Sequence, residues 1–361
     1  MVTHNSLLTR LGVRAPIVLA PMAGTGGVEL AVAVARAGGL GSLPAAMLSS
    51  EQLVEQVGQF RAAFDAPVNT NFFCHTEQPA SDEEMAKWLA VASRFDGELG
   101  VERRPAAGGS PRRAFDDEAC AAVERCRPQV VSFHFGLPDA GLVERVKATG
   151  ALVVSSATTV AEAVWLEAHG CDVVIAQGAE AGGHRGMFLT EDVAAQPGTM
   201  ALVPRVVDAV TLPVIAAGGI ADSRGIVAIL ALGASAAQIG TAYLLCPEAL
   251  TSAAHRRALA GGSRDDTVLT NVFTGRPARG RRNRLVDEVG PMSADAPPFP
   301  MAAVGVGPLR AAAEAQGSGE FSPLWSGQRG VVAEGVPAYE LTVDLVAALP
   351  DAMQRAAARL D

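Results

Sequence analysis

Residues 213–244 read PVIAAGGIADSRGIVAILALGASAAQIGTAYL and contain the pattern that decides the fold. Two short apolar runs, 213–219 and 236–244, flank an Ala-rich segment at 223–233 that closes on glycine, the usual stop of a helix. The apolarity of both runs is continuous rather than alternating, which is typical of strands covered on both faces. The stretch therefore predicts two parallel strands joined by a crossover helix.

The same strand–helix pattern repeats along the chain. Its apolar or β-branched runs, eight in all, fall at 16–22, 40–45, 68–74, 129–136, 151–157, 172–179, 213–219 and 236–244. Helices are expected at 27–38, 49–64, 139–150, 159–170, 200–210 and 223–233. Eight such units predict an α/β fold, a (β/α)8 TIM barrel, with a doubly wound open sheet as the alternative.

Two segments depart from the regular repeat. The first is an insertion after strand 3, residues 76–128, with expected helices at 81–95 and 115–126. Long connections of this kind tend to be functional, and we expect it to cover part of the strand ends. The second follows the barrel, which we assign to 1–262. Residues 263–361 offer too few periodic apolar positions for a core of their own, so we expect an extension packed on the barrel that covers the substrate pocket.

Composition narrows the range of partners and compartments. The 361 residues are 49% hydrophobic, yet no apolar run approaches the roughly 18 residues that span a bilayer, so we expect a soluble globular chain with no membrane partner. A formal net charge of −9 argues against nucleic acid as a partner. The five cysteines form no C-x-x-C pair and the N-terminus has no signal-peptide pattern, which together favour the cytoplasm.

The active site of a barrel lies at the carboxyl ends of its strands, and those ends are rich here in glycine and polar side chains. Gly218 and Gly219 end the seventh run, and Gly240 and Thr241 follow the apolar start of the eighth. Main-chain N–H groups in such loops can hold a phosphate. These two neighbouring loops therefore predict a phosphate-binding site.

Amide side chains end two other strands. Asn71 and Gln177 can donate and accept at once, which suits the edge of a flavin pyrimidine, although either could instead tie down a loop. The glycine-rich run 21–27 lets a flat ring approach the backbone closely. P-loop and dinucleotide motifs are missing, so we expect a mononucleotide cofactor. For the arginines at 276–284 we favour a structural arm over a phosphate site and assign no catalytic role.

Two histidines are candidates for chemistry. His184 follows Gly182 and Gly183, which let the backbone bend and present the imidazole above the strand ends. A histidine with a pKa of about 6.5 can take a proton near neutrality, or bind an anion when charged. Strand alternation turns His134 away from its phenylalanine neighbours, toward the barrel interior, where a structural role is equally open. The chain has no metal-ligand spacing and no G-x-S-x-G nucleophile elbow.

Taken together, the motifs resemble those of the nitronate monooxygenases and are most similar to the class I branch. The resemblance rests on APMAGTGG (20–27), VNTNFF (68–73), SFHFGLP (132–138), AQGAEAGGHRG (176–186), PVIAAGGI (213–220), QIGTAYLLCPEA (238–249), FTGRPARG (273–280) and LWSGQ (324–328). It implies an FMN-containing TIM barrel that oxidises alkyl nitronates with O2 to a carbonyl compound and nitrite, without a nicotinamide reductant. Nitroalkanes are an alternative substrate, and a monomer or homodimer is expected.

The resemblance also implies roles for single residues. His184 would be the catalytic histidine and His134 a substrate-binding residue. A charged His184 would hold the nitronate anion beside the flavin, whereas a neutral His184 would remove the α-proton of a nitroalkane. FMN contacts would fall on Met22, Asn71, Gln177, Gly182, Gly218, Gly219, Gln238, Ile239, Gly240 and Thr241.

One segment departs from the class I pattern. Members of that branch usually carry tyrosines and a lysine after the barrel, where this chain reads APPFPMAAVGVGPLR (296–310), with Phe299 at a position expected for tyrosine. This departure puts the substrate preference in question and leaves the flavin site untouched. Two alternative functions stay open: an FMN-dependent NAD(P)H oxidoreductase of the enoyl-acyl carrier protein reductase type, and a flavin-binding protein without catalysis.

Overall fold

The computed structural model describes residues 6–103, 112–261, 266–330 and 334–359. Its centre is a sheet of eight parallel strands in the order β1-β9-β8-β6-β5-β4-β3-β2, which a bridge between Val18 and Leu40 closes into a barrel. All eight strands lie in the predicted runs, so the (β/α)8 barrel is confirmed and the open sheet was the wrong alternative. The strands are β1 (Ile17–Leu19), β2 (Gly41–Pro44), β3 (Val68–Phe73), β4 (Val130–His134), β5 (Leu152–Ala157), β6 (Val173–Gln177), β8 (Val214–Ala217) and β9 (Ala236–Ile239).

Helices surround the barrel where the sequence predicts them. Polar caps begin several of them: Ser49 and Thr159 form capping boxes, and Asp222 accepts from main-chain N–H groups of its helix. Apolar side chains between strands and helices form the main core, and another cluster fills the barrel interior, to which α1 (Ser6–Leu11) contributes Leu7 and Leu11. The predicted helices are α2 (Val28–Arg36), α3 (Ser50–Ala63), α7 (Ala140–Ala148), α8 (Val160–Ala168), α9 (Thr199–Ala209) and α10 (Ser223–Ala231).

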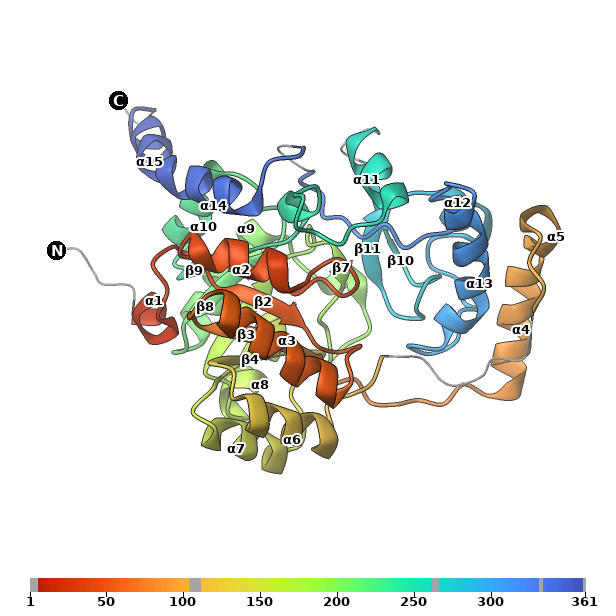
Figure 1. Cartoon of the computed structure of the whole chain (residues 1–361), viewed down its shortest axis with the longest axis horizontal. Coiled ribbons are helices and arrows are strands. Elements are labelled where there is room, and N and C mark those ends of the chain that lie inside the picture. The colour runs from red at the N-terminus through yellow and green to blue at the C-terminus, as the bar shows by residue number, and fades with distance from the viewer. Residues whose placement is uncertain (1–5, 104–111, 262–265, 331–333, 360–361) are drawn as a thin grey trace.

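The eighth barrel helix comes from the far end of the sequence. α14 (Ala338–Ala347) packs against α2, and its Thr342 hydroxyl lies 2.8 Å from the hydroxyl of Tyr243, which follows β9. α15 (Leu349–Ala357) then packs on α10 (Figure 1). The chain thus leaves the barrel after β9 and returns to complete it. The predicted boundary between residues 262 and 263 lies outside the described residues.

A second, smaller core lies beside the barrel, and two segments far apart in the sequence build it together. α4 (Asp82–Ser93) and α5 (Asp96–Leu99) of the insertion lie against α13 (Ala302–Ala315) on one side of the molecule (Figure 1). The Trp88 indole donates to the Ala302 carbonyl over 2.8 Å. The extension therefore has a core only because the insertion contributes to it. The buried members include Trp88, Phe95, Val272, Phe273, Leu285, Val286, Val306, Leu309 and Phe321.

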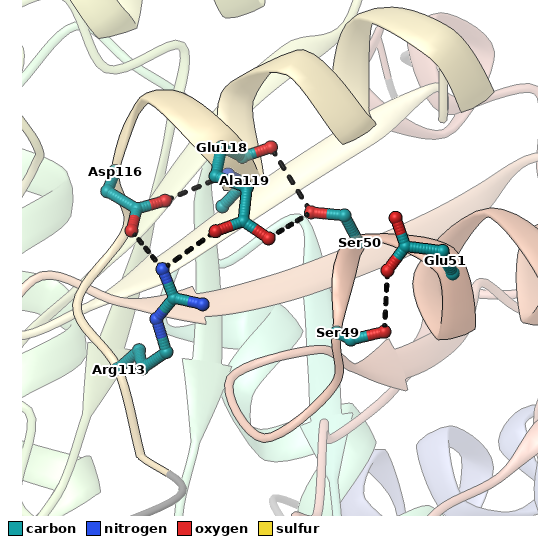
Figure 2. A network of polar contacts seen from close by, with 7 residues as sticks. All are labelled: Ser49, Ser50, Glu51, Arg113, Asp116, Glu118 and Ala119. Atoms are coloured by element: carbon teal, nitrogen blue, oxygen red, sulfur yellow. Dashed lines mark hydrogen bonds and ion pairs between the residues drawn. The ribbon is translucent and has the colours of Figure 1, made fainter.

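The last helix of the predicted insertion belongs to the barrel. α6 (Asp117–Cys126) packs on α3 and α7 and serves as the crossover helix between β3 and β4. Figure 2 shows how the start of α6 is held: Arg113 donates to Asp116 and Glu118, and Ser50 of α3 donates to Glu118. This network anchors the chain next to the preceding residue, Arg112.

A small antiparallel sheet joins the loop after β6 to the extension. Its strands, in the order β10-β11-β7, are β10 (Thr267–Thr270), β11 (Ala278–Arg281) and β7 (Gly183–His184). The remaining elements are α11 (Ala253–Ala260), α12 (Arg284–Val289) and the short 3-10 helices η1 (Val193–Ala195) and η2 (Thr241–Tyr243). All five cysteines have free thiols. In the described part of the chain, every helix is too short or too polar to cross a membrane.

Candidate functional site

A cavity of about 430 Å³ lies at the carboxyl ends of the barrel strands. Its wall includes both predicted histidines, His134 and His184. It also includes nearly all predicted cofactor residues: Met22, Asn71, Gln177, Gly182, Gly218, Gly219, Gln238, Gly240 and Thr241. Ile239 differs from them. Its side chain is buried in the core outside the barrel, because neighbouring residues of a strand point to opposite faces of the sheet.

Glycines form part of this wall at the tips of β8 and β9. Gly218 and Gly219 have φ angles of 116° and 69°, in the left-handed region that favours glycine. A Cβ at Gly218 would lie 3.0 Å from the Ala181 nitrogen. The N–H groups of Gly219 and Thr241 donate to no acceptor among the described residues. This rim borders the cavity and offers the donors that an anionic group such as a phosphate requires.

The two predicted amide side chains are both engaged by the protein. The Gln177 amide nitrogen donates to the main-chain carbonyl of His184 over 3.0 Å, and its oxygen accepts from the Gly186 N–H over 2.8 Å. The Asn71 amide nitrogen donates to the hydroxyl and the carbonyl of Ser132. Gln177 thus ties down the loop that carries His184, which is one of the two roles that its sequence position allowed.

His184 is held by strand pairing rather than by a free loop. It lies in β7 and pairs with Ala278 of β11. The two glycines before it act differently: Gly183 has a φ of 73°, whereas a Cβ at Gly182 would lie 2.5 Å from the Gly327 nitrogen. Gly183 therefore bends the chain, and Gly182 lets it pass close to the extension. Together they place the imidazole on the cavity wall.

His134 contacts the backbone of His184 rather than its ring. Its Nε2 donates to the His184 carbonyl over 3.1 Å, and its Nδ1 lies 3.1 Å from the Ser156 hydroxyl. Because a carbonyl only accepts, Nε2 carries the proton. The two histidines are therefore joined by a contact that holds the loop in place. The role of His134 in substrate binding stays a prediction.

Burial keeps both imidazoles in the neutral form. It lowers the pKa of His134 to about 4, although the hydrogen bond to the His184 carbonyl acts in the opposite direction. Burial is also the largest cause that lowers the pKa of His184 well below its ordinary value, followed by the positive charge of Arg112. Both side chains are therefore neutral at pH 7. A neutral imidazole can accept a proton, and it cannot form an ion pair with an anion.

Sequence reasoning missed four residues of the site. Arg112, His255 and Trp325 line the cavity, and the Thr274 hydroxyl oxygen lies 2.9 Å from Nε2 of His184. The motifs FTGRPARG and LWSGQ pointed to the segments that hold Thr274 and Trp325, but not to these side chains. Arg112 lies in a polar stretch with no periodicity, and His255 lies outside the predicted elements and motifs, so neither position carried a signal.

The arginines at 276–284 mostly support the structure, as the sequence suggested. Arg279 donates to a main-chain carbonyl in the loop after β6, and Arg282 and Arg284 form surface ion pairs. Arg276 has a further effect. Its guanidinium lies 4.1 Å from the centre of the Phe135 ring, and its charge lowers the pKa of both His134 and His184.

An apolar aromatic cluster backs His184. The ring centre of Phe299 lies 5.4 Å from that of His184, and the ring centre of Phe73 lies 6.1 Å from it. Phe299 is buried together with Phe73, Phe135 and Ala46. The position expected for a tyrosine therefore adds no hydroxyl to the surroundings of His184.

Known proteins share this architecture. A family model described as nitronate monooxygenase matches residues 5–348. A nitronate monooxygenase of Pseudomonas aeruginosa is 41% identical over 339 residues, which cover 93% of this chain and 96% of that protein. Among solved structures, nitroalkane oxidase from Streptomyces ansochromogenes has a TM-score of 0.89 and 37% identity, covering 97% of this chain and 99% of its own. FabK from Thermotoga maritima has a TM-score of 0.75 and 26% identity, covering 98% of both chains. The chain therefore belongs to the nitronate monooxygenase family.

Proposed function

We propose that this enzyme binds FMN in the cavity and oxidises alkyl nitronates with O2 to carbonyl compounds and nitrite, with nitroalkanes as the alternative substrate. Nitronate oxidation is the activity of the family to which the chain belongs. One observation carries the assignment of the site. A neutral imidazole, that of His184, lines the same cavity as the glycine rim of Gly218, Gly219 and Gly240.

The described residues fit a flavin mononucleotide. Gly219 and Thr241 offer main-chain donors for a phosphate. The side-chain oxygen of Gln238 is buried and has no hydrogen-bond partner in the described chain, so it can accept from a ring N–H. We assign the FMN contacts to Met22, Asn71, Gln177, Gly182, Gly218, Gly219, Gln238, Gly240 and Thr241, and to Ile239 only through its main chain.

The roles of the protein follow from the charge states. FMN, when bound, supplies the acceptor for the electrons of the substrate. Neutral His184 takes the α-proton of a nitroalkane. Arg112, on the same wall, supplies the positive charge that a neutral imidazole lacks. His134 holds the His184 loop and borders the substrate, and the aromatic cluster of Phe73 and Phe299 favours an alkyl substituent.

The surroundings of the site complete the proposal. We assign to the 263–361 extension the task of covering the substrate pocket, since Leu324, Trp325 and Gly327 line the cavity. We also propose a cytoplasmic enzyme, because a reducing compartment suits five free thiols. Light scattering on the purified protein decides between a monomer and a homodimer.

Aerobic turnover of an alkyl nitronate tests the proposed function. The purified protein should consume O2 and release nitrite without consuming NADH or NADPH, and the cofactor released on denaturation should have the mass of FMN. Oxidation of NAD(P)H without nitrite release would instead support the enoyl reductase alternative. Bound FMN with neither reaction would support a flavin-binding protein without catalysis.

A further inference from the structure

The hydroxyl of Thr274 lies between His184 and a main-chain carbonyl. Thr274 is buried in the turn between β10 and β11, with 1% of its surface exposed. Its oxygen lies 2.9 Å from Nε2 of His184, and it donates to the carbonyl of Arg276 over 3.3 Å. The extension therefore reaches the imidazole of the barrel loop through one polar atom.

A threonine hydroxyl has a single proton, so these two contacts determine each other. The carbonyl of Arg276 can only accept, and it therefore takes the hydroxyl proton. The hydroxyl oxygen must then accept from His184, which places a proton on Nε2. In the opposite arrangement the hydroxyl would donate to Nε2, and the Arg276 carbonyl would lose its only hydrogen-bond donor among the described residues. The first arrangement makes two hydrogen bonds and the second makes only one, so the first is favoured.

The second nitrogen of the ring is then left for chemistry. A neutral imidazole with a proton on Nε2 has a lone pair on Nδ1. Nδ1 of His184 makes no hydrogen bond to any residue that the structure describes, while the ring lines the cavity. Aromatic rings pack around the imidazole and hinder the flip that would exchange its two nitrogens: the ring centres of Phe299, Trp325 and Phe73 lie 5.4, 5.5 and 6.1 Å from that of His184.

We propose that Thr274 holds His184 as the tautomer with its proton on Nε2, and so leaves Nδ1 as the proton acceptor and hydrogen-bond acceptor at the cavity. Thr274 is a positioning residue, because it acts on the substrate only through His184. This inference rests on the proposed role of His184 in the reaction. The position of the proton on the ring can be measured without turnover. The tautomer can therefore be tested independently of the role of His184 in the reaction.

Nitrogen-15 NMR of the histidine-labelled holoenzyme at pH 7.5 tests the tautomer. The signals of His184 are those missing from the His184→Asn variant. We expect one protonated nitrogen, Nε2, in the wild type and in Thr274→Ser, which keeps the hydroxyl. Thr274→Val, which has nearly the same shape, should show a mixture of tautomers and a kcat for a nitroalkane that is lower by roughly three- to tenfold, with the FMN content unchanged.

Several outcomes would overturn this inference. A proton on Nδ1 in the wild type would do so even if Thr274→Val failed to fold. A Thr274→Val variant with the wild-type spectrum would also do so, as would a Thr274→Ser variant that does not restore the wild-type kcat. If His184→Asn kept full activity, the proposed role of His184 would be wrong, and the NMR result would still decide whether Thr274 sets the tautomer.

Discussion

The imidazole of His134 holds the main chain of His184, with Nε2 donating to the carbonyl oxygen over 3.1 Å. The amide of Gln177 donates to the same oxygen over 3.0 Å. Two side chains from the ends of β4 and β6, the strands on either side of β5, thus share one acceptor on the loop. The position of the catalytic candidate is therefore set by the barrel itself and not only by the glycines that precede it.

Removing the His134 donor should loosen this loop. His134→Phe loses a buried hydrogen bond, so we expect the free energy of unfolding to fall by about 1–3 kcal/mol and kcat to fall several-fold. Urea denaturation and nitroalkane-dependent O2 consumption measure the two effects. Ser156→Ala is the matched control, because it removes the contact with Nδ1 and keeps the bond to His184. Equal loss of kcat in both variants would contradict the importance of that bond.

The two glycines before His184 should respond differently to a methyl group. Gly182→Ala would place Cβ 2.5 Å from the Gly327 nitrogen and 2.6 Å from the Ser326 carbonyl carbon, which only a backbone shift can relieve. We expect a lower melting temperature and FMN affinity weakened by about tenfold, a loss of about 1.4 kcal/mol. In Gly183→Ala the added Cβ would meet no atom within 4 Å. The only cost is the backbone strain of a left-handed φ angle, about 1–2 kcal/mol. FMN titration by fluorescence should show a larger loss of FMN affinity in Gly182→Ala than in Gly183→Ala. A larger loss in Gly183→Ala would contradict the close approach of residues 182 and 327.

Buried histidines should make the protein sensitive to acid. The pKa values of His134 and His255 are lowered by burial to about 4, so between pH 6.5 and 4 the unfolded chain binds protons that the folded chain does not. The contribution of these groups to the free energy of unfolding is fully present above pH 6.5. It is lost as the pH falls toward 4, by roughly 3 kcal/mol for each group. Urea denaturation across this range measures the loss. His255→Gln keeps a donor for the Trp325 carbonyl and should flatten the dependence; an unchanged slope would refute the contribution of His255.

The second core can be tested with two glycines of one helix. In α13, a Cβ at Gly305 would lie 2.6 Å from the Trp88 ring, whereas a Cβ at Gly307 meets no atom within 4 Å apart from its neighbours in the chain. Gly305→Ala should destabilise the protein by about 1–3 kcal/mol through overpacking. Gly307→Ala should change the stability by less than about 0.5 kcal/mol, because the preference of alanine for the helix is offset by the contact of its Cβ with the ring of Pro308, which follows it. Calorimetric melting distinguishes the two, and similar melting temperatures for both variants would contradict the packing of α4 on α13.

The barrel could be predicted from the sequence because each strand and most helices carry a local signal. Continuous apolar runs marked the strands, and glycines marked the helix ends. The origin of the eighth helix had no such signal, since α14 packs on α2, about three hundred residues earlier in the chain. The second core was missed for the same physical reason: Trp88 and Val306 form a buried cluster only after the chain has folded.

The sequence also predicted those parts of the site that carry a local signal. Residues that lie directly at strand ends or next to glycine, such as Gln177 and His184, stood out by position. Ile239 was included through its motif, and the alternation of the strand turns its side chain into the core. Arg112 and Thr274 lie in irregular segments, where no periodicity predicts the direction of a side chain. The effect of Arg112 on the pKa of His184 and the contact of Thr274 with its ring depend on the insertion and the extension, which long-range packing brings to the barrel.

Turnover of His184→Asn with FMN bound tests the role of His184 most directly. Nitroalkane-dependent O2 consumption and nitrite release are measured after the flavin content has been matched to that of the wild type, with the surface variant His169→Asn as the control. We expect kcat/KM to fall by about 100-fold or more in His184→Asn, as is usual when a positioned acid–base group is removed, and to stay unchanged in the control. Undiminished turnover in His184→Asn with FMN still bound would contradict the role assigned to this residue.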